Sequence, residues 1–267
     1  MNTLDNPGSF TPYHLKSIRM ITSSVLSKFK SGEFIKAFNF LVTESLNSWN
    51  KKKILNKKGK YYCPLCENHS GSFIHMSNSF RYSFNSVCPY CSSRARHRGL
   101  LFLYKKEISG LDTESRVLHF APEPVFYSIF KNKSFRYQTT DYILEDVDLP
   151  KQDVQNLSIA DDMYDRILSN HVIEHVQDDI KALSEMYRIT KKGGKVIITV
   201  PGNFKRARTV YFENLKNNGH YRDYGIDFIK KLEKVFNKVE IIDLNSFDTT
   251  GELAIPKREL VFIGIKL

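Results

Sequence analysis

The stretch that decides the fold is Asp165-Arg-Ile-Leu-Ser-Asn-His-Val-Ile-Glu-His-Val176, together with the segment that follows it. Its short β-rich run at 166–169 predicts a strand, and polar side chains come directly after it. Apolar residues then recur at the helical period from Ile180 to Thr190. Asp178-Asp179 stands before this helix and Lys191-Lys192-Gly193-Gly194 after it, which are typical residues for a helix start and a helix end. The run at 196–200 predicts the next strand.

Outside this stretch the same alternation continues. Further β-rich runs lie at 117–120, 135–140, 239–244 and 260–267, and a helical pattern covers 226–236. Strands that alternate with helices predict an α/β fold with a doubly wound, mostly parallel, Rossmann-like sheet. Residues 10–50 instead carry apolar positions at helical spacing, so we expect one or two amphipathic helices there.

The composition fits a folded protein with a basic N-terminal part. The chain has 267 residues, 41% of them hydrophobic, and a net charge of +11. Residues 1–110 hold 17 Lys and Arg against 5 Asp and Glu, whereas residues 111–267 hold 23 against 24, so the surplus lies in the first part. This composition argues against intrinsic disorder. We see neither a window that could span a membrane nor a cationic leader, and therefore expect a cytoplasmic protein.

Four cysteines form two CxxC pairs. Cys63 and Cys66 are separated from Cys88 and Cys91 by 21 residues, and the chain has no other cysteine. Two such pairs can close a tetrahedral shell of four thiolates around a structural Zn²⁺. His69 and His75 lie between the pairs and could replace a ligand, although four thiolates already suffice. We therefore divide the chain into a helical segment (1–58), a zinc-binding module (59–110) and an α/β domain (111–267).

A cationic cluster, Arg94-Ala-Arg96-His97-Arg98, follows the second pair directly. It could present guanidinium groups to a phosphate-bearing substrate, since these groups suit phosphate. It could equally begin a helix whose apolar residues, from Leu100 to Leu103, dock the module on the rest of the protein. The sequence leaves both interpretations open for the arginines.

Two motifs of the α/β domain resemble class I S-adenosylmethionine-dependent methyltransferases, of the methyltransferase type 11 kind. The segment 165–176 is similar to the "hVLEHv" element after the fourth strand of that family, and Met186–Ile198 is similar to its "hRxLKPGGxhhh" turn. More closely, the chain resembles a bacterial subgroup with a CPxCxSxxRHR element, an LHFAPE segment and a His-x-Arg-x-Tyr-Gly element. These correspond here to residues 88–98, 117–123 and 220–225.

The resemblance implies a cofactor site for S-adenosylmethionine at the carboxyl ends of the strands. It implies that Asp141 binds the ribose and Asp153 the adenine amino group. The family's glycine-rich loop is absent, because His119, Ala121 and Glu123 stand where its acid and first two glycines belong, and Glu123 could meet the cofactor's ammonium group. The residues expected to bind the cofactor are His119, Ala121, Glu123, Asp141, Asp153, Asn170 and His171.

Methyl transfer needs a positioned acceptor and, for a hydroxyl acceptor, a base. Histidine suits that role near neutral pH, so His175 and His220 are the candidate catalytic residues, and Arg222 could hold an acceptor phosphate or carboxylate. The leading hypothesis is a methyltransferase that acts on a small-molecule or carbohydrate-type acceptor. The alternatives are a zinc-ribbon RNA methyltransferase, because the N-terminal part is basic, and a non-catalytic zinc-ribbon binding protein with a degenerate methyltransferase fold.

Overall fold

The computed structural model describes residues 18–30, 33–77, 82–213 and 219–267. Residues 10–17 of the predicted N-terminal helical segment lie outside the described residues. The chain forms two compact units. One comprises Ile108–Asp243 with Leu260–Leu267, and the other comprises the described residues up to Glu107 with Leu244–Glu259.

The first unit is built on a seven-stranded sheet with the order β12-β13-β9-β8-β5-β6-β7. Strands β9, β8, β5, β6 and β7 pair in parallel, whereas β13 runs antiparallel to both of its neighbours. This confirms the predicted α/β, Rossmann-like class. The strands are β5 (Arg116–Phe120), β6 (Arg136–Asp141), β7 (Leu149–Pro150), β8 (Tyr164–Asn170), β9 (Thr190–Thr199), β12 (Lys238–Asp243) and β13 (Leu260–Ile265).

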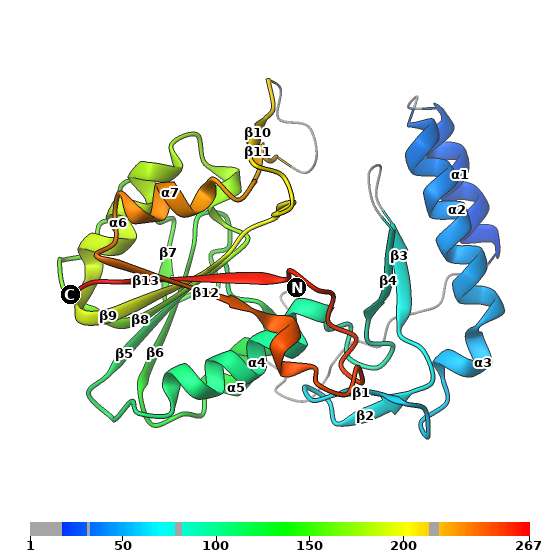
Figure 1. Cartoon of the computed structure of the whole chain (residues 1–267), viewed down its shortest axis with the longest axis horizontal. Helices are drawn as coiled ribbons and strands as arrows, with labels where there is room; N and C mark the ends of the chain where they lie inside the picture. Colours follow the sequence, from blue (N-terminus) through cyan, green and yellow to red (C-terminus); the bar gives the residue numbers. More distant parts are fainter. Residues whose placement is uncertain (1–17, 31–32, 78–81, 214–218) are drawn as a thin grey trace. The chain divides into compact units, whose positions relative to one another are not determined.

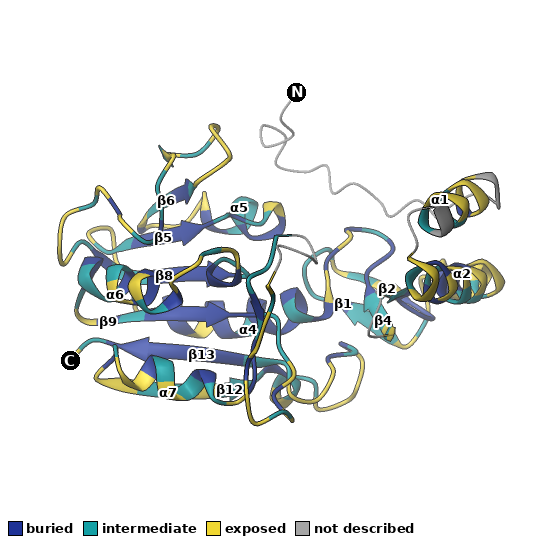
Figure 2. Cartoon of the chain, turned by 90° about the horizontal axis from the view of Figure 1, so that it is seen from above, coloured by how far each residue is buried: buried dark blue, intermediate teal, exposed yellow. Residues whose placement is uncertain are grey.

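Helices cover both faces of this sheet. Helices α6 (Asp179–Ile189) and α7 (Phe228–Glu233) lie on one face, and α5 (Pro124–Phe130) lies on the other (Figure 1). A large apolar cluster fills the core between the sheet and α6 and α7, and the central strands are buried along most of their length (Figure 2). Each of these large apolar side chains contributes about 1.5–3 kcal/mol when it leaves water. Two short elements complete the unit, the 3-10 helix η2 (Ile173–His175) and the hairpin β10 (Val210–Tyr211) with β11 (Arg222–Asp223).

Helix α6 begins as the sequence predicts but ends earlier. The Asp178 carboxylate caps its start by accepting a hydrogen bond from the Lys181 N–H, at 3.0 Å. The helix ends at Ile189, so Lys191–Gly194, which we expected to close it, lie in β9 instead. Gly193 has a φ of +79° and its N–H donates to the Lys266 carbonyl at 2.7 Å. Backbone hydrogen bonds to the neighbouring strand thus extend the sheet into this segment.

The second unit combines helices with two small antiparallel hairpins. Asn47 of α2 forms two hydrogen bonds with the backbone of His75, to its carbonyl at 2.9 Å and from its N–H at 2.8 Å, and so ties the helix to β3. The hairpins pair β1 with β2 and β3 with β4. The elements are α1 (Ile18–Lys30), α2 (Phe34–Trp49), α3 (Lys51–Ile54), β1 (Tyr61–Cys63), β2 (Asn68–Ser70), β3 (Ile74–Ser77), β4 (Tyr82–Val87), α4 (Ala95–Ile108) and the 3-10 helix η3 (Leu244–Phe247).

A distant segment of sequence, Leu244–Glu259, belongs to this second unit. The Tyr62 N–H donates to the Glu252 carbonyl at 2.9 Å. Gly99 of α4 permits a close approach to η3, because a Cβ at this position would lie 2.7 Å from the Leu244 Cβ. The sequence placed residues 244–259 in the α/β domain, since nothing local distinguishes them from a loop between two of its strands.

Candidate functional site

The loop after β5 turns without the glycines that the related family uses. Ala121 adopts a left-handed backbone conformation, with a φ of +46°, and its N–H donates to the Thr140 carbonyl at 2.8 Å. Such a φ is unusual for a residue with a Cβ. Glu123 then returns to an extended conformation, and Pro124 begins α5. The alanine thus takes the turn conformation for which glycine is the usual residue.

Hydrogen bonds join the ends of three strands at this edge of the sheet. The Glu123 carboxylate, which follows β5, accepts a hydrogen bond of 2.6 Å from the side-chain amide of Asn170 at the end of β8. The Asn170 side-chain oxygen accepts one of 3.1 Å from the Thr199 hydroxyl at the end of β9. Three polar side chains from three strand ends are therefore preorganised where a ligand of a parallel sheet binds.

His119 lies beneath this row of side chains and is completely buried. Its Nδ1 is 2.8 Å from the Tyr137 hydroxyl, and its Nε2 is 3.9 Å from the nearer Glu123 carboxylate oxygen. Burial lowers the pKa of His119 to about 4, although the Glu123 charge opposes this shift. The ring is therefore neutral near pH 7 and is enclosed by the protein, and its predicted role at the cofactor stays a prediction.

The two aspartates expected at the cofactor both take part in turns. One oxygen of Asp141, at the end of β6, accepts hydrogen bonds from the N–H groups of Ile143 and Leu144, at 2.6 and 2.8 Å. Asp153 accepts a hydrogen bond of 2.9 Å from the Gln155 N–H. These contacts fix the orientation of each carboxylate. Their roles at a ribose and an adenine stay predictions.

The structure brings the two candidate catalytic histidines together, although 45 positions separate them in the sequence. The His175 and His220 rings meet edge to face, with centroids 4.6 Å apart. His175 follows β8 in η2, whereas His220 lies in the loop before β11. Burial lowers the pKa of His220 below its usual value, while the carboxylate of Glu174 opposes this shift. A neutral imidazole at this place could accept a proton.

Glu174 is a site residue that the sequence did not reveal. An acid at this position of the sequence would ordinarily lie at a helix start, but η2 has only three residues and the Glu174 side chain is fully buried. One of its oxygens lies 3.2 Å from Nδ1 of His171 and 4.0 Å from Nε2 of His175. Glu174, His175 and His220 offer ligand atoms that lie within 4.8 Å of one another. Only the folded chain shows this group, because His220 comes from a distant loop.

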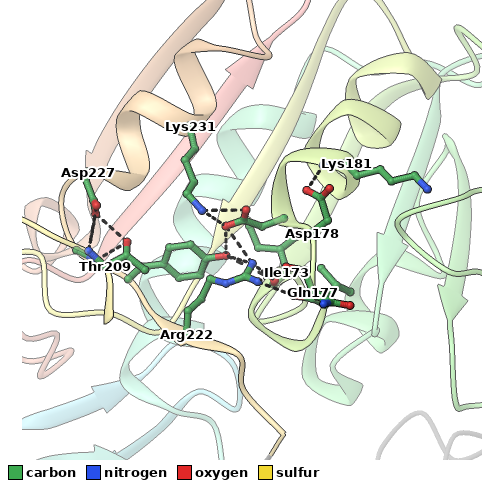
Figure 3. A network of polar contacts seen from close by, with 12 residues as sticks. Ile173, Gln177, Asp178, Lys181, Thr209, Arg222, Asp227 and Lys231 are labelled. Atoms are coloured by element: carbon green, nitrogen blue, oxygen red, sulfur yellow. Dashed lines mark hydrogen bonds and ion pairs between the residues drawn. The ribbon is translucent and has the colours of Figure 1, made fainter. Parts of the chain in front are cut away.

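A buried ionic network holds the loop of His220 in place (Figure 3). The Arg222 guanidinium donates to the carbonyls of Val176 and Gln177, at 2.8 and 2.5 Å, and lies 3.0 Å from Asp179. Lys231 forms a second ion pair with Asp179, at 2.6 Å. Since Arg222 is 2% exposed and its partners are protein groups, it does not serve as the acceptor anchor that we considered. It positions the loop instead.

The four cysteines of the second unit converge. The sulfurs of Cys63 and Cys91 are 3.6 Å apart and those of Cys66 and Cys88 are 3.7 Å apart. A tetrahedral ion with Zn–S bonds of about 2.3 Å requires sulfurs about 3.8 Å apart, so the spacing fits Zn²⁺. The group that could hold a metal here contains only these cysteines among the described residues, without His69 or His75.

Two residues of the cationic cluster after the cysteines, Arg98 and His97, make contacts within the second unit. Arg98 is completely buried, and its guanidinium stacks on Phe73 at 4.2 Å. It donates hydrogen bonds to backbone carbonyls, including those of Leu253 at 2.5 Å and Ser86 at 3.2 Å. His97 accepts a hydrogen bond of 3.2 Å from the Arg94 N–H near the start of α4. Arg98 is therefore structural, and not part of a surface that could meet a phosphate.

Comparison with known proteins finds similarity to methyltransferases in part of the chain. Residues 97–198 match the family described as a methyltransferase domain. This range contains β5, β6 and β8 and nearly all of β9, and thus most of the strand ends described above. The match supports the expectation of an S-adenosylmethionine-dependent methyltransferase.

Curated relatives are similar over limited regions. Phosphoethanolamine N-methyltransferase 2 of Caenorhabditis elegans is 24% identical over 143 residues, which cover 54% of this chain and 29% of that protein. Demethylmenaquinone methyltransferase of Streptomyces avermitilis is 42% identical over 65 residues, which cover 24% of this chain and 28% of that protein. The chain thus spans less than a third of the length of these relatives.

Solved structures show the same general similarity. A methyltransferase from Archaeoglobus fulgidus has a TM-score of 0.47 at 15% identity, over 65% of this chain and 95% of that one. Phosphoethanolamine N-methyltransferase 2 of Haemonchus contortus, in complex with S-adenosyl-L-methionine, has a TM-score of 0.45 at 16% identity, over 68% and 54% of the two chains. Separately, no helix in the described part of the chain is long and apolar enough to cross a membrane.

Proposed function

We propose that this protein transfers a methyl group from S-adenosylmethionine to a small-molecule acceptor, with carbohydrates included in that class. The observation that carries the proposal is the methyltransferase-domain match over residues 97–198, which contain the polar strand ends of β5, β6 and β8. The names of the curated relatives, which refer to phosphoethanolamine and demethylmenaquinone, agree with a small acceptor.

The residues at these strand ends could each bind a different part of the cofactor. Asp141 would accept the ribose hydroxyls and Asp153 the adenine amino group, while Glu123, oriented by Asn170, would meet the cofactor's ammonium group. The cofactor supplies an activated methyl group. The chain has to align the acceptor with it and remove a proton where the acceptor is a hydroxyl. His175, which follows β8, and His220, in the loop before β11, are the groups that could accept that proton.

The cysteine group would hold a structural zinc in the second unit. Four thiolates fill the coordination shell and leave no position for a reacting molecule. The shell is reinforced by the Ser93 hydroxyl, which lies 3.2 Å from the Cys63 sulfur and 3.1 Å from the Cys91 sulfur. We therefore assign this metal a role in folding, without a part in the transfer.

Calorimetric titration with S-adenosylmethionine and S-adenosylhomocysteine tests the proposal. Asp141→Asn is the informative variant, because the amide oxygen can still accept the turn hydrogen bonds from Ile143 and Leu144 while the charge is lost. A charge-assisted hydrogen bond contributes about 1.5–3 kcal/mol, so binding should weaken at least about tenfold. Asp146→Asn, an exposed acid of the same loop, is the matched control and should bind as the wild type does. A wild type that binds neither compound would favour the non-catalytic alternative.

A further inference from the structure

The carboxylate of Glu174 is in an unfavourable position for the chain alone. Its side chain has no exposed surface, and neither oxygen has a hydrogen-bond partner among the described residues. Its ion-pair contacts within the described part of the chain are with two histidines, His171 at 3.2 Å and His175 at 4.0 Å. A buried, ionised carboxylate costs several kcal/mol unless a cation or donors compensate it.

The cations nearby are already used by other groups. Arg222 pairs with Asp179 and donates to the carbonyls of Val176 and Gln177. Lys231 also pairs with Asp179, at 2.6 Å. The network of Figure 3 therefore satisfies Asp179 and leaves Glu174 to the histidines. Lys231 and Arg222 thus leave no fixed cation for the Glu174 carboxylate among the contacts of the described residues.

His175 is oriented as a metal-binding histidine is. Nδ1 of His175 lies 3.3 Å from the Gly219 carbonyl, which can only accept, so this nitrogen carries the proton. The lone pair of the neutral ring is then on Nε2, the atom that faces Glu174. Histidines that bind metals commonly donate their second nitrogen to a backbone carbonyl in this way. His220 lies against His175, with the two ring centroids 4.6 Å apart, so it can offer a nitrogen to the same ion.

We propose that Glu174, His175 and His220 form a second metal site, for a divalent ion of the Zn²⁺ class, separate from the four cysteines. Two imidazoles and one carboxylate are a ligand set of zinc sites that keep an open position. Their ligand atoms lie within 4.8 Å of one another, and a tetrahedral ion with bonds of about 2.1 Å requires roughly 3.4 Å. Side-chain rotations that move the ligand atoms toward one another by about 1 Å would close this difference. His171, 3.2 Å from Glu174, borders the open side.

The role of this ion rests on the proposed function, whereas its binding does not. A divalent ion with an open position lowers the pKa of an oxygen ligand that it binds. At the end of β8 it would favour an acceptor that offers a hydroxyl, whose proton passes to solvent when the oxygen binds. The site therefore indicates an oxygen acceptor in preference to an amine, and His175 and His220 then act as ligands in place of a free base.

Metal analysis of the full-length protein tests the site without any methyl-transfer assay. The protein is loaded with Zn²⁺, dialysed, and its metal content measured by mass spectrometry for the wild type, Glu174→Gln and His220→Ala. The wild type should hold one ion per chain more than either variant. Glu233→Gln, an exposed acid in α7, is the matched control and should retain the wild-type content.

Loading with Co²⁺ shows which site holds the ions that remain in the two variants. Absorption from thiolate-to-cobalt charge transfer reports the cysteine site, so it should be unchanged in both variants while the total cobalt falls by one ion per chain. Equal metal content in the wild type and both variants would overturn the proposal. Titration with S-adenosylmethionine is a separate measurement, so a failure of the proposed function and a failure of the metal site can be distinguished.

Discussion

Replacing Arg222 by methionine should destabilise the α/β unit by about 3 kcal/mol. Methionine keeps much of the apolar stem but removes the ion pair with Asp179 and the donors to Val176 and Gln177. Loss of one partner of a buried ion pair costs about 3–5 kcal/mol. The lower end applies here, because Asp179 keeps Lys231 at 2.6 Å as a second partner.

Urea denaturation followed by circular dichroism measures this loss. Arg136→Met is the control, since Arg136 is 52% exposed and pairs with an exposed acid, Glu114. Such a surface pair contributes about 0–1 kcal/mol. If Arg222→Met costs no more than Arg136→Met, the network does not hold the His220 loop, and the reasoning fails.

Three further predictions concern other buried groups. Cys88→Ser should lower the zinc content of the purified protein and reduce the stability of the second unit, which metal analysis and a melting curve would show. Arg98→Met removes the donor to the Leu253 carbonyl, so limited proteolysis should cut within 244–259 faster than in the wild type; equal rates would contradict its structural role. The pKa of His119 falls from 6.5 to about 4 on folding, so the unfolded state takes up this proton first as the pH falls. Stability should therefore decrease from pH 6.5 to pH 4, by roughly 3 kcal/mol, and a His119→Gln variant should lack this part of the slope in urea titrations.

The parts of the fold that depend on short-range patterns could be predicted. The alternation around 165–198 predicts β8, α6 and β9, because strand and helix periods are visible within a few residues. The end of α6 could not be predicted, since pairing of Gly193 with Lys266 extends β9 across a pattern typical of a helix end. Similarly, residues 244–259 join the second unit through contacts such as that of Leu244 with Gly99, which no local pattern encodes.

In the candidate site too, features set by neighbouring residues could be predicted, and contacts between distant residues could not. The cysteine pairs were evident because ligand spacing within each pair is local, and the sulfur distances of 3.6 and 3.7 Å agree with it. The sequence also singled out His175 and His220, but not their contact, which depends on the Arg222 network. Arg98 and Arg222 were both candidates for anion binding, because a sequence records their charge and not their burial.

Glu174 shows why contacts between distant residues, which a sequence does not record, matter for function. In the sequence it is one acid in a polar stretch, where capping a helix is the ordinary role. Its burial follows from the loop that returns to it, in which the Tyr221 N–H donates to the Glu174 carbonyl at 2.8 Å. That same hydrogen bond brings the adjacent His220 to His175. Among the described residues, the chain thus buries a carboxylate without a hydrogen-bond donor at the place where it brings imidazoles together, and the proposed cation would account for both features.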